Sequence, residues 1–314
     1  MNAETLLVLH TPEGTAYRFY EVRQFVFRKE KYTPYTELSL TVQDKDGIVP
    51  ALCVFNRIVF TVNGNNLHEG LADSVDYCIE GGVSVIRIRS RGFTSLLLNN
   101  QMVPGLHTAM SINKLMQNYY DFPFPVKWKH DITTCDYIYV KPNRSMWDSV
   151  VNLGYKLYDS YPYIRYANEI NLDPHEDTSG CMFTKADYLS AGWITNTKGM
   201  LSHLHMQDLE GNYGVYNHES PVAESMHIVR HKQIAFDRQY LDDPQRSMEL
   251  TFSLASKGWR SRYVTVSGYV KLDVNDYVSA DGIFFPARIS AVTVTGDKNG
   301  VFTTYAVYAD DFSS

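Results

Sequence analysis

The first hundred residues alternate between apolar and polar side chains, a pattern typical of antiparallel strands with one buried face. The alternation predicts strands at 17–28, 35–42, 51–62, 67–79 and 83–89. Turn sequences separate them, with DKDG at 44–47, NGNN at 63–66 and a glycine pair at 81–82. We therefore expect residues 1–100 to form one small β-barrel domain.

After these strands the apolar positions change to a helical period. Short helices are predicted at 93–99 and 111–120, interrupted by Val-Pro-Gly at 103–105. The sequence DFPFP at 121–125 is expected to be an extended connector, because its two prolines disfavour a helix. A strand at 137–140, a helix at 146–157 with Ser145 as its N-cap, and a strand at 170–172 follow. Residues 101–178 are therefore predicted to hold a helical connector and a small α+β module.

Residues 179–314 return to a β-rich pattern, with strands and long loops expected up to residue 238. Asp243 and Pro244 supply the cap and first turn of a helix at 247–256, which Gly258 ends. Strands at 262–270, 277–279, 285–294 and 301–308 follow, and the TGDKNG sequence predicts a hairpin between the last two. The predicted fold class is α+β and predominantly β, with two small β-barrel domains flanking the α+β insert.

Composition and charge exclude several classes of function. The chain has 314 residues with a formal net charge of −6, which argues against a protein that wraps nucleic acid by neutralising phosphates. No apolar stretch approaches the roughly eighteen residues of a membrane helix, and the first residues lack a basic signal region. We therefore expect a soluble protein without membrane contact. Four widely spaced cysteines are expected to be buried and reduced: Cys53, Cys78, Cys135 and Cys181.

Motifs for catalysis or cofactor binding do not stand out. The sequence lacks G-x-S-x-G, P-loop and G-x-G-x-x-G patterns. The carboxylates considered for a two-carboxylate mechanism are scattered along the chain, namely Glu69, Asp73, Asp208 and Glu210. His203 and His205 share one face of a strand, and Asp208 or His218 could complete a metal site, but no known ligand spacing is matched. We predict no enzyme activity, no cofactor and no bound metal.

Three arginines alternate along the strand near residue 88. Arg87, Arg89 and Arg91 share one face of that strand. Guanidinium groups bind carboxylates through paired hydrogen bonds, so this face is predicted to contact a neighbouring subunit. The alternative is a solvated strand face.

Five segments carry a resemblance to a known family. They are NRIVFTVNG and LHEG within 56–70, VIRIRSRGFTSLLLNNQMVPG at 85–105, YIYVKPNRSMWDSVVNLGYKL and YPYIRYANEI within 137–170, GWRSRYVTVSGY at 258–269, and ARISAVTVTGDKNGVFTTY at 287–305. In this order they resemble the central baseplate hub proteins of contractile phage tails and phage-tail-like particles, which are relatives of the late-control-D group.

The resemblance implies a structural role as a homotrimer. Two β-barrel domains in each of three subunits would form a ring around a central channel and adapt the hexameric tail tube to the trimeric spike. The implied partners are the tail tube or tube-initiator protein, the spike and other baseplate proteins, with DNA only as a passenger through the channel. The implied location is the baseplate of a virion or phage-tail-like particle, assembled in the host cytoplasm.

The central module also resembles a LysM domain. The sequences SMWDSV at 145–150 and IRYANEINL at 164–172 carry this resemblance, with Trp147 at the helix start and Asn168 and Ile170 in the places of the late asparagine and isoleucine. KPNRS stands where the glycine-aspartate turn usually lies. The resemblance implies binding of N-acetylglucosamine polymers, but we favour a packed structural element with Trp147 in its core. Two alternatives to the hub stay open: a peptidoglycan-binding or cell-wall-degrading tail protein, and a hexameric distal tail or tube-initiator protein.

Overall fold

Strands dominate the secondary structure. The computed structural model describes residues 4–50, 52–129, 132–175 and 178–309. It has 45% strand and 17% helix, which confirms the predicted class of α+β, predominantly β. Within the described ranges, no helix combines the length and the apolar character needed to cross a membrane.

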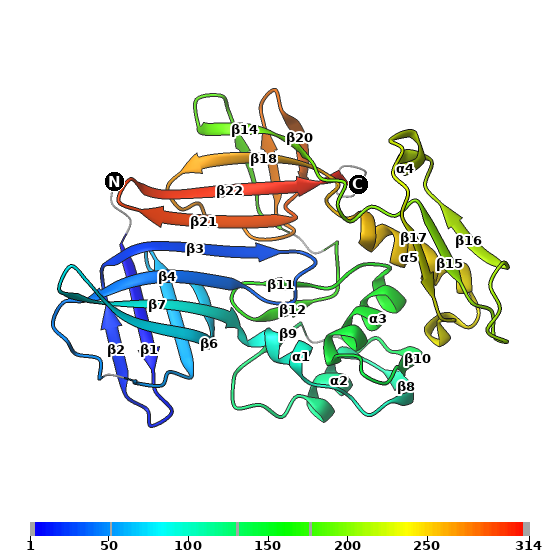
Figure 1. The fold of residues 1–314 in the computed structure, drawn as a ribbon, viewed down its shortest axis with the longest axis horizontal. Helices are drawn as coiled ribbons and strands as arrows, with labels where there is room; N and C mark the ends of the chain where they lie inside the picture. Colours follow the sequence, from blue (N-terminus) through cyan, green and yellow to red (C-terminus); the bar gives the residue numbers. More distant parts are fainter. Residues whose placement is uncertain (1–3, 51, 130–131, 176–177, 310–314) are drawn as a thin grey trace.

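The largest element is a sheet of eleven strands that combines both ends of the chain (Figure 1). Its order is β14-β18-β22-β21-β3-β4-β7-β6-β5-β1-β2. The N-terminal strands are β1 (Thr5–His10), β2 (Ala16–Phe19), β3 (Val22–Glu30), β4 (Glu37–Asp44), β5 (Arg57–Val62), β6 (Asn65–Glu80) and β7 (Val83–Gly92). The C-terminal strands are β14 (Tyr188–Thr195), β18 (Arg260–Ser267), β21 (Ala291–Asp297) and β22 (Gly300–Tyr308).

The two ends of the chain meet where β3 pairs with β21, with Glu30 opposite Ala291. The prediction of two separate barrels is corrected here, because described strands from both ends of the chain join one continuous eleven-stranded sheet, in which no closed barrel is found. The physical reason is that β3 pairs with β4 on one side only, and a strand from the far end of the chain takes its other side. Alternation within a strand shows which face is buried, but not which strand is its neighbour.

The strands bury one face of the sheet. In β3, Phe25 and Phe27 are buried while Gln24 and Arg28 are exposed, as the alternation predicts. The ring of Phe25 contacts that of Phe60 on β5, with centroids 4.8 Å apart, although three strands separate β3 from β5 in the sheet. The N-terminal half of the sheet therefore curls, and its buried side chains belong to one hydrophobic core that also includes Val294 and Tyr305 of the C-terminal strands.

Several boundaries differ from the sequence-based expectation. The predicted strand at 17–28 is divided into β2 and β3, and β1 was not predicted. The strand expected at 51–62 begins only at Arg57, and residue 51 lies outside the described ranges. The strand expected at 285–294 is two strands, β20 (Phe284–Arg288) and β21. Cys135 is buried as expected, whereas the other three cysteines are partly exposed.

The middle of the chain forms a compact module with its own hydrophobic core. Its elements are η1 (Phe93–Ser95), α1 (Leu96–Asn99), β8 (Gly105–Met110), α2 (Ile112–Tyr119), β9 (Lys127–Trp128), β10 (Cys135–Val140), α3 (Met146–Tyr158), β11 (Tyr163–Arg165) and β12 (Glu169–Asn171). Helix α3 begins at the predicted cap: the Ser145 hydroxyl accepts from the Asp148 N–H, and the Asp148 carboxylate accepts from the Ser145 N–H. Strand β10 pairs with β8, whereas β12 pairs with β11 and β9, so the first and last strands of the predicted module lie in different sheets.

Two smaller sheets complete the C-terminal part. Strands β13 (Gly180–Phe183), β19 (Tyr277–Ala280) and β20 cover the apolar face of the main sheet, where the rings of Phe183 and Tyr305 stack. The other sheet lies to one side in Figure 1 and consists of β15 (His203–Met206), β16 (Tyr216–Glu219) and β17 (His231–Ile234). The helices of this region are α4 (Pro221–Ser225), η2 (Arg238–Tyr240) and α5 (Pro244–Ser256). Helix α5 starts at the predicted Asp243 cap and packs Met248 and Phe252 against this sheet.

Candidate assembly surfaces

The three predicted arginines lie on the uncovered face of the main sheet, on β7. Arg87 donates to Asp76 at 2.9 Å and also pairs with Glu80, both on the neighbouring β6. Arg91 binds both carboxylate oxygens of Asp73, at 2.7 and 2.9 Å. Two of the three guanidinium groups therefore already have carboxylate partners within the same chain. Arg89 is exposed and has no ion-pair partner among the described residues.

The strand register shows that this uncovered face is polar along most of its width. Thr265, Thr304 and Thr293 stand side by side on β18, β22 and β21, and the first two share a hydrogen bond of 2.9 Å. A second row runs across β21, β3, β4 and β7 and consists of Thr295, Val26, Ser39 and Arg89. The row lines a shallow hollow of about 510 Å³. This face therefore carries short hydroxyl side chains and the arginines of β7, together with the apolar Val26.

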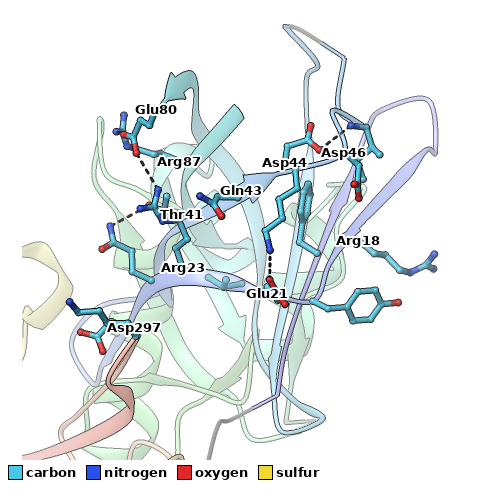
Figure 2. Close-up of a pocket in the computed structure, with 17 residues that line it drawn as sticks. Arg18, Glu21, Arg23, Thr41, Gln43, Asp44, Asp46, Glu80, Arg87 and Asp297 are labelled. Carbon is cyan, nitrogen blue, oxygen red and sulfur yellow. Dashed lines mark hydrogen bonds and ion pairs between the residues drawn. The ribbon is translucent and has the colours of Figure 1, made fainter. Parts of the chain in front are cut away.

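A larger trough of about 890 Å³ continues from this hollow past the end of the sheet (Figure 2). Its ionic side chains are five basic and five acidic: Arg18, Arg23, Lys45, Arg87 and Lys298, with Glu21, Asp44, Asp46, Glu80 and Asp297. Lys45 binds Glu21 at 2.8 Å and lowers the pKa of that carboxyl. The trough is therefore charged but balanced, which is unsuited to holding a polyanion.

One edge of the main sheet is open and apolar. Strand β14 pairs with β18 on one side, and no described strand pairs with its other side. Trp193 on β14 is 73% exposed and stands opposite Arg262 in the register. Arg262 lines a hollow of about 570 Å³ together with Met182, which is 70% exposed, and Phe285, which is 88% exposed. Large apolar side chains exposed together in this way are typical of a protein contact surface.

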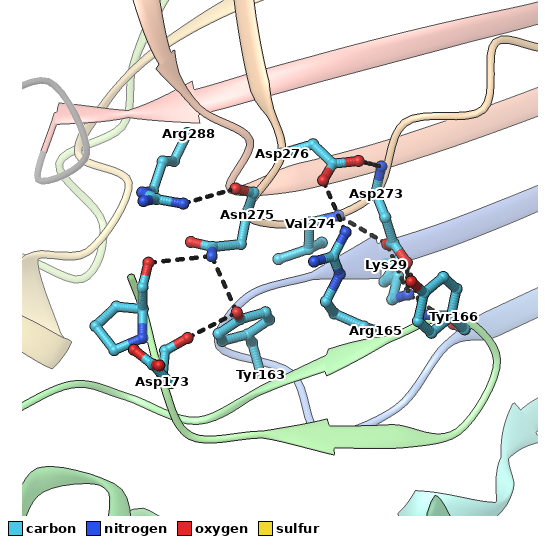
Figure 3. Close-up of polar contacts among 11 residues, drawn as sticks. Lys29, Tyr163, Arg165, Tyr166, Asp173, Asp273, Val274, Asn275, Asp276 and Arg288 are labelled. Carbon is cyan, nitrogen blue, oxygen red and sulfur yellow. Dashed lines mark hydrogen bonds and ion pairs between the residues drawn. The ribbon is translucent and has the colours of Figure 1, made fainter. Parts of the chain in front are cut away.

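A buried ionic network fastens the central module to the sheet (Figure 3). Lys29 on β3 binds the Asp273 carboxylate at 2.7 Å and donates to the Tyr166 carbonyl at 2.6 Å. Arg165 on β11 binds Asp276 at 2.7 Å, and the side chains of this pair are 8% and 4% exposed. Burial lowers the pKa of Lys29 and raises that of Asp276. The network therefore joins three regions of the chain: β3, the module, and the loop before β19.

Sequence reasoning missed this network, although one signal for it exists. Lys29 falls in the same inward register as Phe25 and Phe27, which is an unusual place for a lysine. A buried lysine requires a partner of opposite charge. The partner, Asp273, lies on a loop, and the alternation of apolar and polar residues within strands does not show where a loop lies in the fold.

The residues of the LysM resemblance lie inside the protein. Trp147 is 3% exposed, as expected for a core residue, and its Nε1–H donates to the Tyr161 hydroxyl at 3.1 Å. Ile170 is 1% exposed within the core of the module. Asn168 donates to the Glu69 carbonyl at 2.8 Å and accepts from the Thr94 N–H at 3.4 Å. Asn168 therefore docks the module onto strand β6.

A glycine of the sheet makes this docking possible. A Cβ atom at Gly92 would lie 2.8 Å from Thr36 Oγ1, closer than real Cβ atoms approach, and 3.0 Å from Asn168 Oδ1, which is an unusually tight contact. Asn168 and Trp147 are 8% and 3% exposed, so neither side chain lies open at the surface.

The other candidate residues are dispersed. His203 and His205 share the exposed face of β15, but the ring of His218 packs on Phe252 on the opposite face. Asp208 accepts from the Asn212 N–H within a turn. Among the scattered carboxylates, Glu69 pairs with Arg57 at 2.5 Å and Asp73 with Arg91. Neither the set of His203, His205 and His218 nor the carboxylates that the sequence analysis considered and set aside form one cluster among the described residues.

Comparison with known proteins gives the fold a context. No protein-family model matches the chain, and no curated protein does. Among solved structures, a tail protein from Neisseria meningitidis superimposes with a TM-score of 0.72 at 12% identity, over 99% of this chain and 98% of that one. The 43 kDa tail protein of prophage MuSo2 from Shewanella oneidensis gives the same score and identity over 97% and 98%.

A third similar structure comes from a secretion system. A component of the type VI secretion system of E. coli, described as similar to T4 bacteriophage tail proteins, superimposes with a TM-score of 0.56 at 9% identity. The match covers 91% of this chain and 73% of that one. The chain therefore has the fold of phage tail proteins and of this secretion component over nearly its whole length.

Proposed function

We propose that this chain is the structural hub of a contractile tail or injection-system baseplate and assembles as a homotrimer. The shared fold with a tail protein over 99% of the chain and with a prophage tail protein over 97% supports a place in such a particle. The observation that carries the trimer is the open, apolar edge at β14. Strand β14 has one unpaired edge and carries the exposed Trp193, so it is a template for pairing with another chain unless an interface covers it.

The geometry of the sheet favours a closed ring. Its two edges, β14 and β2, are different strands at opposite ends of the strand order. A contact between the β14 surface of one subunit and the β2 end of the next is heterologous, and such contacts close into rings when the rotation allows. Three subunits joined in this way form a ring with one face of each sheet directed to the centre.

The uncovered polar face is the one proposed to line the central channel. The other face is already covered by β13, β19, β20 and the hydrophobic core. Threonine and serine side chains, together with arginines that are paired with carboxylates, provide a hydrated channel surface that does not bind the phosphate groups of DNA strongly. DNA is then a passenger, and the arginines of β7 face the channel instead of the neighbouring subunit.

The proposed partners are the tail tube or tube-initiator protein above the ring, the spike below it, and other baseplate proteins around it. The proposed location is the particle baseplate, after assembly in the host cytoplasm. The role is one of shape and needs no catalysis. The burial of Trp147 and Asn168 supports a structural use of the central module over glycan binding.

Size-exclusion chromatography with light scattering tests the proposal. We expect a particle of three 35.9 kDa chains. Trp193→Asp should weaken each contact by about 2 kcal/mol, or about thirtyfold, because the lost burial is that of one large apolar side chain. Leu106→Asp is a matched control, since Leu106 is 61% exposed on the distant strand β8.

Three outcomes count against the hub. A lone subunit at high concentration refutes the trimer, and a hexamer points to a distal tail or tube-initiator protein. Sedimentation with purified peptidoglycan, or clearing of a peptidoglycan gel, points to a wall-binding or wall-degrading tail protein.

A further inference from the structure

A histidine and two glutamates meet on the exposed face of the small sheet. His203 on β15 stands opposite Glu219 on β16, and Glu224 comes from the short helix α4. The Nε2 atom of His203 lies 3.9 Å from a Glu219 oxygen and 3.7 Å from a Glu224 oxygen. One atom from each side chain lies within 4.8 Å of the other two. This set differs from the one that the sequence suggested, because only His203 belongs to both.

The hydrogen bonds around Ser202 determine which nitrogen of His203 faces the glutamates. Ser202 is buried, and its hydroxyl donates to the Arg230 carbonyl at 3.0 Å and accepts from the Arg230 N–H at 2.8 Å. Since the hydroxyl proton is already used, the 2.9 Å contact between Ser202 Oγ and His203 Nδ1 requires Nδ1 to be the donor. In the neutral ring, Nε2 therefore carries the lone pair.

This lone pair is directed at two carboxylates, which also carry only lone pairs. Such an arrangement is repulsive unless a proton on Nε2 or a metal cation lies between the groups. One imidazole nitrogen and two carboxylate oxygens are a ligand set suited to zinc, with a fourth position open to water. The ligands of a tetrahedral zinc ion lie about 3.3 Å apart, given bond lengths near 2.0 Å. The two contacts of His203 Nε2, at 3.9 and 3.7 Å, must therefore shorten by about half an ångström, and the two glutamate oxygens, which lie within 4.8 Å of each other, must also approach. The glutamate side chains are 63% and 50% exposed, so they can move.

We propose that His203, Glu219 and Glu224 form a site for a divalent transition metal, with zinc as the preferred ion. Ser202 is a positioning residue, because its hydroxyl orients the ring through Nδ1, as is usual for metal-bound histidines. The bound ion joins β15 to the end of β16 and to α4, and so fixes the outer corner of the small sheet.

His205 offers a matched control on the same strand face. Its Nδ1 is engaged by the Asn217 side-chain oxygen at 2.6 Å, and its Nε2 lies 3.4 Å from His231 Nδ1. Both nitrogens are therefore occupied within the protein. Glu210 is a matched control for the glutamates, since it is exposed on a nearby turn and outside the cluster.

The test is zinc binding by the full-length, tag-free protein, measured by competition with a chromogenic chelator and by metal analysis after dialysis. We expect one zinc per chain, with affinity reduced at least about tenfold by His203→Ala, Glu219→Gln or Glu224→Gln. His205→Ala and Glu210→Gln should bind as the wild type does. Cobalt should give visible absorption bands that disappear in His203→Ala and persist in His205→Ala.

Two results overturn the proposal. One is the absence of stoichiometric zinc from the wild-type protein. The other is an equal loss of binding in His203→Ala and His205→Ala, which identifies non-specific binding to exposed histidines. Because these residues lie at the surface, we expect each variant to fold as the wild type does. Circular dichroism of each variant checks this and so separates a loss of binding from unfolding.

Discussion

His68 is a fully buried histidine, and acidification is therefore expected to destabilise the main sheet. Its ring lies between the Thr36 hydroxyl, 2.8 Å from Nδ1, and the Ser90 hydroxyl, 2.7 Å from Nε2. Burial lowers the pKa of His68 to about 3, and no acidic group among the described residues compensates for this. The folded protein holds this ring neutral, whereas the unfolded chain protonates it near its ordinary pKa of about 6.5.

The size and sign of the effect follow from this difference in pKa. Between the two pKa values the unfolded state binds more protons, so stability falls as the pH falls below about 6.5. At pH 5.0 the loss attributable to His68 is about 2 kcal/mol, and it grows until the pH approaches 3. Above about pH 7 His68 is neutral in both states, so it causes no loss of stability.

Urea unfolding at pH 7.5 and at pH 5.0 measures the effect, with His68→Gln as the comparison. Glutamine keeps a donor and an acceptor for the two hydroxyls but does not titrate. The wild type should lose about 2 kcal/mol more than His68→Gln over this interval, because the contributions of all other groups cancel in the difference. Equal losses in the two proteins would refute the assignment of a neutral, buried His68.

Two further predictions concern the ionic side chains. Arg165→Met should lower the free energy of unfolding by about 3 kcal/mol or more, because Asp276 stays buried without its partner. Urea unfolding measures this, with Arg28→Met as the control, since a change of an exposed arginine is expected to alter stability by no more than about 0.5 kcal/mol. An equal effect of the two changes contradicts the prediction. Arg89→Glu should leave the trimer mass unchanged if this residue faces the channel, whereas dissociation in light scattering supports the subunit interface that the sequence predicts.

The sequence was sufficient for local structure because the relevant signals lie within a few residues of each other. The cap at Ser145, the helix after Asp243 and the shared face of Arg87 and Arg89 all follow from near neighbours. The insert boundaries at residues 100 and 178, and an interface role for the arginines, stay predictions.

Contacts between distant segments were beyond the reach of the sequence alone. Lys29 meets Asp273, and His203 meets Glu219, only because strand pairing brings separate segments together. Periodicity carries no information on that pairing. For the same reason the single sheet was mistaken for two barrels.

The pairing of β3 with β21 has a consequence for how the protein is made. These strands are roughly 260 residues apart in the chain, so the ribosome releases the first long before the second exists. Until then one side of β3 stays unsatisfied, and Lys29 lacks its counter-ion. Folding is thus expected to finish late in synthesis, and nascent chains truncated before residue 273 should be prone to aggregation and proteolysis.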